Sequence, residues 1–302
     1  MEKEERTKRI MQVTLFGSLA NLLLLLFKFV AGILGHSSAM VADAVHSLSD
    51  FITDMVVLLF VRISSKPKDE GHDYGHGKYE TFATMIIGVV LLFVGFGLLW
   101  DGLIKIANYY INGKELESPE WIALIAAGTS ILVKELLYQI TRKVGVKMNS
   151  QAVVANAWHH RSDAFSSIGT ALGVGGAILL GPQWRVLDAV AATIVSLFII
   201  KVSLELIMPA ANDLLEQSLP KKVEDKILDL ILETPEVKNP HNLRTRRIGN
   251  DIAIEVHIRV DGQMTVSHAH ELTREIERKL RAVFGEETHV VLHVEPIKNG
   301  VS

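Results

Sequence analysis

Two segments far apart in this sequence share one pattern of metal-ligating side chains. Residues 42–50 read Ala-Asp-Ala-Val-His-Ser-Leu-Ser-Asp, and residues 155–163 read Ala-Asn-Ala-Trp-His-His-Arg-Ser-Asp. Both follow A-[D/N]-A-x-H-x-x-S-D, which places a His and an Asp four residues apart. On a helix these two side chains lie on the same face, one turn apart.

Two such helices, packed side by side, bring together His46, Asp50, His159 and Asp163. Two imidazoles and two carboxylates suit a tetrahedral Zn²⁺ ion. Asp43 and Asn156 lie one turn earlier on the same faces. We expect them to orient the ligand side chains without binding the metal themselves.

The alternative is a purely structural polar network between two helices. Ionisable side chains are costly inside a bilayer and usually mark function there, and this pattern occurs twice, so a metal site is favoured. Asp54 continues the polar face by one more turn and either lines an ion path or faces a cavity.

Composition narrows the kind of site. The chain has no Cys, which excludes disulfides and thiolate ligands, and it has 12 His. The net charge of -3 does not indicate a nucleic-acid partner. His268 to Leu272 does not form the HExxH motif of zinc proteases.

The first two thirds of the chain indicate a membrane domain, since 49% of all residues are hydrophobic and the mean hydropathy is +0.28. A helix needs about 20 apolar residues to span a bilayer. Six segments qualify, with the second and fifth less apolar than the others: 11–34, 39–61, 82–106, 119–140, 152–180 and 186–208. Lys and Arg gather in the starting tail and in the loops after the second and fourth segments, so both termini are expected to be cytoplasmic.

The last third predicts a small soluble domain. Residues 221–233 and 266–284 have helical patterns, the second with Ser267 as its expected N-cap. Residues 243–248, 252–260 and 289–295 alternate as strands, the first two joined by a turn at Gly249. We therefore predict an all-α six-helix transmembrane domain (11–211) after a cytoplasmic tail (1–10), followed by a cytoplasmic αββαβ domain (212–302) of the ferredoxin or metallochaperone-like kind.

With these motifs and this order of elements, the sequence resembles the cation diffusion facilitator family over nearly its whole length. The two HxxxD helices are similar to that family's transport site, and residues 72–80 are similar to its HxxGHGKxE segment. The resemblance implies a homodimer that exports a divalent metal in exchange for protons, with no organic cofactor. His46 instead of Asp favours Zn²⁺, while Fe²⁺, Co²⁺, Cd²⁺ and Mn²⁺ stay open, because imidazole and carboxylate suit several of these ions.

The resemblance also implies secondary sites. Asp69, His72 and His76 match a loop metal site, for which a surface loop that merely contains histidines is the alternative. A binuclear regulatory zinc site in the soluble domain is also implied, with ordinary surface histidines as the alternative. It would use five residues: His241, His257, His270, His293 and Glu295. Lys78 is expected to form the salt bridge that supports the dimer, with Asp213 as its first candidate partner and Glu216 as its second.

Two other classes of function remain as alternatives. An intramembrane metalloenzyme would use the same ligands with a bound water as nucleophile, and a metal sensor would use the soluble domain as its active part. The paired HxxxD helices favour transport over both. By analogy with relatives, the expected location is a prokaryotic inner membrane.

Overall fold

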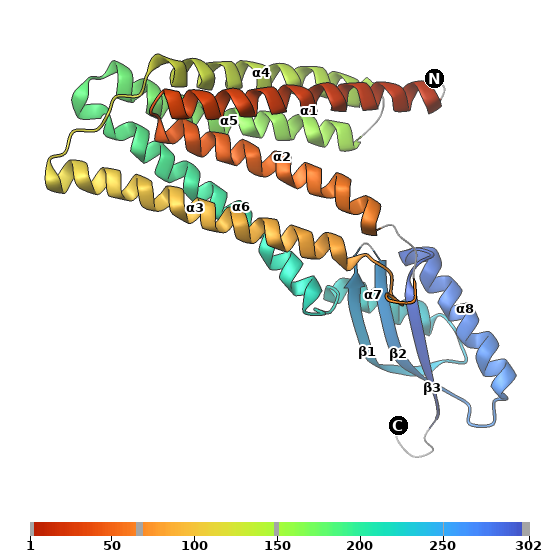
Figure 1. The fold of residues 1–302 in the computed structure, drawn as a ribbon. Helices are drawn as coiled ribbons and strands as arrows, with labels where there is room; N and C mark the ends of the chain where they lie inside the picture. The colour runs from red at the N-terminus through yellow and green to blue at the C-terminus, as the bar shows by residue number, and fades with distance from the viewer. Residues whose placement is uncertain (1–2, 65–68, 148–150, 250, 298–302) are drawn as a thin grey trace. The chain divides into compact units, whose positions relative to one another are not determined.

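The computed structural model describes residues 3–64, 69–147, 151–249 and 251–297, and Figure 1 shows the order of their elements. Six long helices come first in these ranges: α1 (Lys3–Leu34), α2 (Ser38–Ser64), α3 (Lys78–Asn112), α4 (Trp121–Lys147), α5 (Gln151–Leu179) and α6 (Val186–Leu214). A 3-10 turn, η1 (Pro182–Trp184), precedes α6.

Four of the described helical segments are long and apolar enough, each on its own, to cross a membrane. They lie in α1, in α3, in α4, and in η1 with α6. The helices that carry the repeated motif, α2 and α5, are not among these four segments, for which only the described residues were considered. A count of six spans therefore stays a prediction from the sequence.

Two helix ends differ from the sequence expectation. α1 begins at Lys3, so the charged residues expected as a separate tail form its first turns. Glu, Lys and Arg are good helix formers, and no Gly or Pro interrupts them. α6 continues through Pro209 to Leu214, although its apolar segment was expected to end at residue 208. Proline is tolerated inside membrane helices, where neighbouring groups can satisfy the freed carbonyl.

The chain divides into two compact units. The first contains Met1–Met55 and Ile87–Glu205, and the second contains Val56–Ile86 and Leu206–Ser302. The first unit holds most of the helical bundle, and the second holds the α2–α3 loop together with the C-terminal residues.

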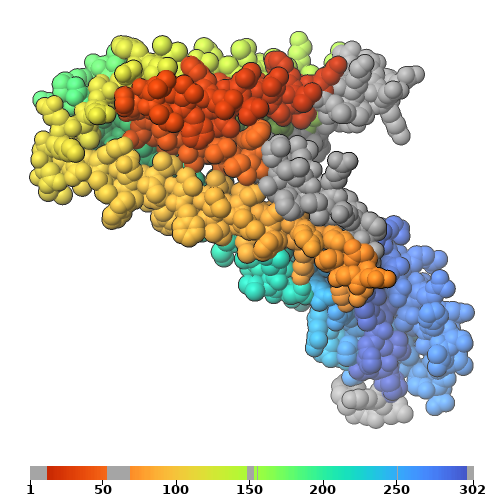
Figure 2. Space-filling view, viewed as in Figure 1, coloured from red at the N-terminus to blue at the C-terminus, as the bar shows by residue number. Residues whose placement is uncertain are grey.

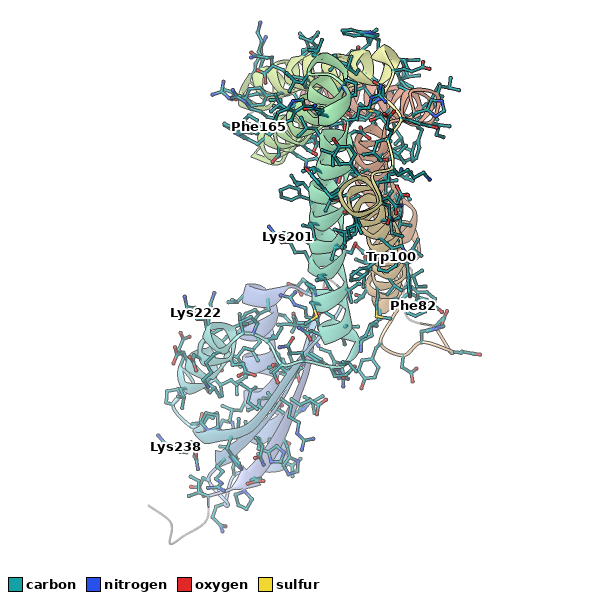
Figure 3. The ribbon with its side chains drawn as sticks, turned by 90° about the vertical axis from the view of Figure 1, so that its left-hand side faces the viewer. Phe82, Trp100, Phe165, Lys201, Lys222 and Lys238 are labelled. Atoms are coloured by element: carbon teal, nitrogen blue, oxygen red, sulfur yellow. The ribbon has the colours of Figure 1, made fainter. Side chains whose placement is uncertain are left out.

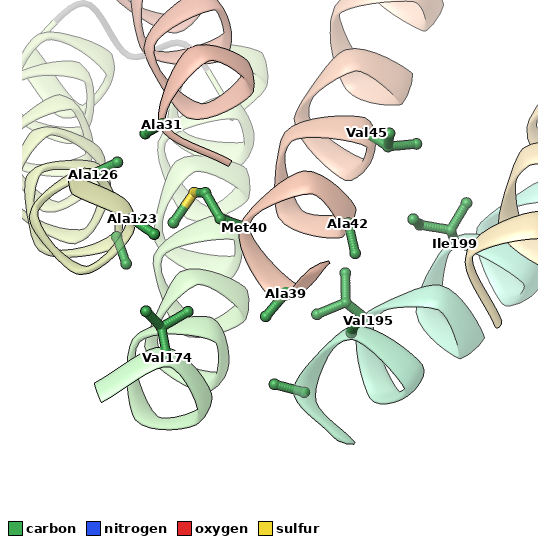
Figure 4. Close-up of a cluster of buried hydrophobic side chains, with 13 residues drawn as sticks. Ala31, Ala39, Met40, Ala42, Val45, Ala123, Ala126, Val174, Val195 and Ile199 are labelled. Carbon is green, nitrogen blue, oxygen red and sulfur yellow. The ribbon is translucent and has the colours of Figure 1, made fainter. Parts of the chain in front are cut away.

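Small side chains form the centre of the helical unit. Ala31, Ala39, Ala42, Ala123 and Ala126 are completely buried and appear together in Figure 4 with Met40 and with Val174 of α5. Small residues let helix backbones approach closely, which is how helices associate in lipid. The core therefore gains its contacts from close packing and not from large side chains.

The outer surface of these helices is apolar. Large hydrophobic side chains are exposed along α1 and α3, whose side chains occupy much of the face seen in Figure 2, and Phe165 projects outward from α5 in Figure 3. Phe93 of α3 is 74% exposed and Phe165 is 63% exposed. Such a surface is expected where lipid, and not water, surrounds the helices.

The C-terminal part has the predicted αββαβ order. Its elements are α7 (Lys221–Leu232), β1 (Lys238–Ile248), β2 (Asp251–Val260), α8 (Val266–Phe284) and β3 (His289–Pro296). The sheet order is β1-β2-β3, with β1 antiparallel and β3 parallel to β2. α7 and α8 pack their buried residues against one face of the sheet, including Ile254 and Ile258 of β2.

Two local features of this domain differ from the prediction. β1 begins at Lys238, five residues before its predicted start, and it has irregular register on both sides of His241. Asn239 and Asn242 take positive φ angles there, a conformation that Asn adopts more readily than most residues. Thr265, and not Ser267, caps α8, and its side chain accepts a hydrogen bond from the backbone N–H of His268.

Candidate metal centre

Three of the four expected ligands lie together in the helical unit. One ligand atom each from His46, Asp50 and Asp163 lies within 4.8 Å of the other two. Two ligands of one zinc ion lie less than about 4.3 Å apart, so a small shift would let all three bind one ion. Nδ1 of His46 is buried and has no hydrogen-bond partner among the described residues, as an unused metal ligand would be.

The fourth residue, His159, lies at the rim of this cluster. Its side chain is 52% exposed, and its Nδ1 is 3.8 Å from Oδ1 of Asp163. It lines the same cavity of about 910 Å³ as the other three residues. His159 is therefore beside the site, and it would have to turn inward to complete a tetrahedral ligand set.

The wall of this cavity away from the ligands is mostly apolar and comes from α5 and α6. A Cβ at Gly173 of α5 would lie 2.3 Å from the Cβ of Ala191 on α6, which is shorter than any real contact. The missing side chain therefore lets α6 approach α5 beside the cavity. The ligands are the polar end of a site with otherwise hydrophobic walls, a setting that strengthens charge interactions.

A lysine outside the repeated motif contacts one of the candidate ligands. Nζ of Lys134, on α4, donates to Oδ2 of Asp163 at 2.7 Å, and both side chains are buried. The sequence showed Lys134 only as an isolated charge in an apolar segment. Its intramembrane position was the one signal that could have marked it.

Asp43, which was expected to orient the ligands, contacts Lys28 and Ser167. Nζ of Lys28, on α1, lies 2.8 Å from Oδ2 of Asp43 and donates to Ser47 at 3.0 Å and to Ser167 at 3.2 Å. Ser167 in turn donates to Asp43 at 3.1 Å. Asp43 therefore joins α1, α2 and α5 in a buried polar network. Asn156 is half-buried on α5, and the side chain of Asp54 lies outside the described part of the chain.

The predicted loop site is assembled in the second unit. Asp69 Oδ1 lies 3.1 Å from His72 Nδ1, and Asp69 Oδ2 lies 3.3 Å from His76 Nε2. The hydrogen bond from His72 holds the pKa of Asp69 below its usual range, which keeps this carboxylate ionised. Nδ1 of His76 is buried without a partner among the described residues. These three residues can hold one ion.

The same loop touches the C-terminal sheet within that unit. A Cβ at Gly77 would lie 2.7 Å from the backbone oxygen of Ile248, at the β1–β2 turn. The rings of Tyr74 and His289 meet edge to face, with centroids 5.2 Å apart. Loop and sheet therefore form one packed surface.

The histidines of the C-terminal domain form one row across the sheet. His241, His257 and His293 are paired in register on β1, β2 and β3. Glu295 Oε1 lies 3.1 Å from His257 Nδ1, and Glu295 Oε2 lies 3.4 Å from His241 Nε2. The hydrogen bond from His257 holds the pKa of Glu295 below its usual range.

His241, His257 and Glu295 have ligand atoms within 4.8 Å of one another, whereas His293 Nε2 is 4.0 Å from Glu295 Oε1 at the edge of the group. His270 does not join this group. It is exposed on α8, the helix that packs against the opposite face of the sheet.

Lys78 pairs with Glu216, the second of its two candidate partners, and not with Asp213. Arg246 of β1 binds the other oxygen of Glu216 at 2.8 Å. The hydrogen bond from Lys78 holds the pKa of Glu216 below its usual range. This network joins the start of α3, the end of α6 and β1 within one protomer.

Comparison with known proteins decides the class. Residues 14–215 match the cation efflux transmembrane domain, and residues 219–297 match the cytoplasmic domain of cation efflux proteins. This chain belongs to the cation diffusion facilitator family. As a cation diffusion facilitator it is an integral membrane transporter, which excludes the intramembrane metalloenzyme.

Three relatives show how broad the family is around this chain. The manganese efflux system protein MneP of Bacillus subtilis is 33% identical over 97% of this chain and 98% of its own length. Metal tolerance protein C1 of Arabidopsis thaliana is 37% identical over 93% of this chain and 61% of its own length. The magnetosome protein MamB of Magnetospira sp. is 31% identical over 90% of each chain.

Proposed function

We propose that this cation diffusion facilitator exports a divalent first-row transition metal in exchange for protons, through a site formed by His46, Asp50, His159 and Asp163. The observation that carries this proposal is the meeting of His46, Asp50 and Asp163 within 4.8 Å, from two helices with the same motif. The cavity beside them gives an ion access to the ligands.

Zinc is the first candidate for the transported ion. One imidazole and two carboxylates lie together. His159, whose Nδ1 is 3.8 Å from Oδ1 of Asp163, can supply a second imidazole. This N₂O₂ set suits zinc in tetrahedral geometry.

Manganese is the second candidate. The relative from Bacillus subtilis that matches 97% of this chain is named for manganese efflux. Mn²⁺ prefers oxygen ligands, and two of the three clustered ligands are carboxylates, with His159 left at the rim. An ion held by the three clustered residues and by water would favour manganese, or iron, over zinc.

Exchange with protons follows from the ligand chemistry. Metal binding requires neutral imidazole and ionised carboxylate, so loading releases protons. Imidazole changes its charge near physiological pH, and a protonated His46 cannot act as a ligand. Protons that enter from the far side therefore release the ion, and the protonated site returns toward the cytoplasm.

The transporter acts as a homodimer in a prokaryotic inner membrane with both termini in the cytoplasm. The match to the cytoplasmic cation efflux domain supports the dimer, and the Lys and Arg of the tail and of two loops support the orientation. In this arrangement the loop cluster and the row of histidines face the cytosol. They bind metal when its concentration is high and favour the transport-ready state, provided that metal binds this state better.

The proposal is tested by metal flux into proteoliposomes under an imposed pH gradient, with Zn²⁺, Mn²⁺, Fe²⁺, Co²⁺ and Cd²⁺ in parallel. We expect gradient-dependent flux that disappears in Asp50→Ala, and Asp213→Ala serves as an acidic control outside the site. Flux of Mn²⁺ without Zn²⁺ would decide between the two candidate ions. Absence of flux for every metal, from folded protein, would overturn the transport proposal.

A further inference from the structure

A buried lysine occupies one carboxylate of the candidate transport site. Lys134 Nζ donates to Asp163 Oδ2 at 2.7 Å, with 5% of the lysine side chain and 7% of the aspartate side chain exposed. The other oxygen of Asp163 faces His159 Nδ1 at 3.8 Å. Both carboxylate oxygens thus have neighbours before any metal binds.

A lysine ammonium and a divalent metal compete for the same carboxylate. The ammonium is a compact charge on a flexible four-carbon stem, so it can leave Asp163 without movement of the α4 backbone. A metal held by His46, Asp50 and Asp163 would lie close to this ammonium and repel it. A bound metal therefore disfavours the present position of Lys134, because the two cations compete for the charge of one carboxylate.

We propose that Lys134 is a tethered counter-cation that holds Asp163 while the site is empty and is displaced when metal binds. The inference rests on the proposed function, because it needs Asp163 to be a ligand of the transported ion. Lys134 then acts as a positioning residue with two effects. It weakens metal binding by competition, and it speeds metal release by returning to Asp163.

A second buried pair in the same unit provides an internal comparison. Lys28 and Asp43 are each 1% exposed and lie 2.8 Å apart, but Lys28 also donates to Ser47 and Ser167. For Lys134 the hydrogen bond shown within the described residues is the one to Asp163. An ammonium held by three partners braces the helices, whereas one held by a single carboxylate is easier to displace. Asp43 is also not a member of the ligand cluster.

The experiment compares Lys134→Met with Lys28→Met, a matched removal of a buried lysine away from the ligands. Both are made in the full-length chain with His72→Ala and His257→Ala, so that the loop and cytoplasmic clusters do not contribute. Equilibrium binding of Mn²⁺ and Zn²⁺ is measured by competition with a chelating dye, and KM and kcat are measured by flux in proteoliposomes.

We expect Lys134→Met to bind metal at least about tenfold more tightly, the lower end of what a hydrogen bond between charged groups contributes. KM and kcat should fall together, because release becomes slow. Lys134→Arg keeps the charge and should restore KM toward its original value. Lys28→Met should leave KM unchanged.

Unchanged or weaker binding in Lys134→Met would overturn the inference, as would an equal gain of affinity in Lys28→Met. Failure of the underlying function has a different signature. In that case the parent protein itself shows no flux, or Asp50→Ala leaves its flux intact. A parent that transports through Asp50, combined with a Lys134→Met variant of unchanged KM, rejects the counter-cation alone.

Discussion

Replacement of Asp163 by Asn should destabilise this protein much more than the same replacement of Asp50. Asp163 neutralises Lys134 at 2.7 Å inside the bundle, and its removal leaves a buried ammonium without its partner. Breaking a buried ion pair from one side costs about 3–5 kcal/mol. In the described part of the chain no Lys or Arg lies within ion-pair distance of Asp50, so Asp50→Asn should cost about 1 kcal/mol, the usual effect of a point mutation.

The cost of Asp163→Asn corresponds to an apparent melting temperature lowered by on the order of 10 °C. The double variant Asp163→Asn/Lys134→Met should recover most of this loss, because a buried pair replaced as a whole is often neutral in stability. It should not recover transport, since the ligand is still missing. The double variant would then regain thermal stability without regaining transport.

The assay is thermal unfolding followed by tryptophan fluorescence, in one detergent and with a metal chelator present. The chelator matters because bound metal stabilises the folded state by mass action. Equal melting temperatures for Asp163→Asn and Asp50→Asn would refute the reasoning. So would a double variant that is less stable than Asp163→Asn alone.

Three further predictions concern His159, the ion pair of Lys78 with Glu216, and the row of histidines on the sheet. His159→Ala should raise KM about tenfold and keep measurable flux, because His159 is half exposed beside the cluster; complete loss of flux would show that it is an essential ligand. Glu216→Gln should lower the stability of the full chain by about 1 kcal/mol, as for a partly exposed ion pair, equally at pH 7 and pH 5.5. Lys78 lowers the pKa of Glu216. The stability that this ion pair contributes is therefore fully present above the unfolded pKa of about 4.3, and it is lost only as the pH falls through the lower folded pKa. A loss of stability in Glu216→Gln that changes near pH 6.5 would contradict this. His293→Ala should reduce the response of flux to cytosolic metal severalfold without abolishing transport, and an inactive variant would reject a regulatory role.

The helices and the meeting of His46, Asp50 and Asp163 could be predicted because they follow from local patterns. A four-residue spacing fixes His46 and Asp50 on one helix face, and the repeat places Asp163 on the matching face of α5. What spacing cannot give is the rotamer of each side chain. His159 has the same spacing from Asp163, yet it lies at the rim of the cluster.

The missed contacts all depend on partners distant in sequence. Lys134 and Lys28 meet Asp163 and Asp43 only after α1, α2, α4 and α5 have packed, and no local pattern marks those pairs. The early start of β1 was hidden because irregular register around His241 breaks the alternation that identifies a strand.

The position of His270 also could not be predicted from the sequence. It was grouped with the sheet histidines by resemblance, but α8 covers the opposite face of the sheet. Here the topology, and not the residue type, decides which side chains can meet.

The most direct test of the account is a structure of the full chain loaded with Mn²⁺ or Zn²⁺, with the metal located by anomalous scattering. We expect a peak about 2.0–2.2 Å from ligand atoms of His46, Asp50 and Asp163, with Lys134 moved away from Asp163. Metal found only at the loop cluster and at the row of histidines, in a protein that still transports it, would contradict the assignment of the transport site.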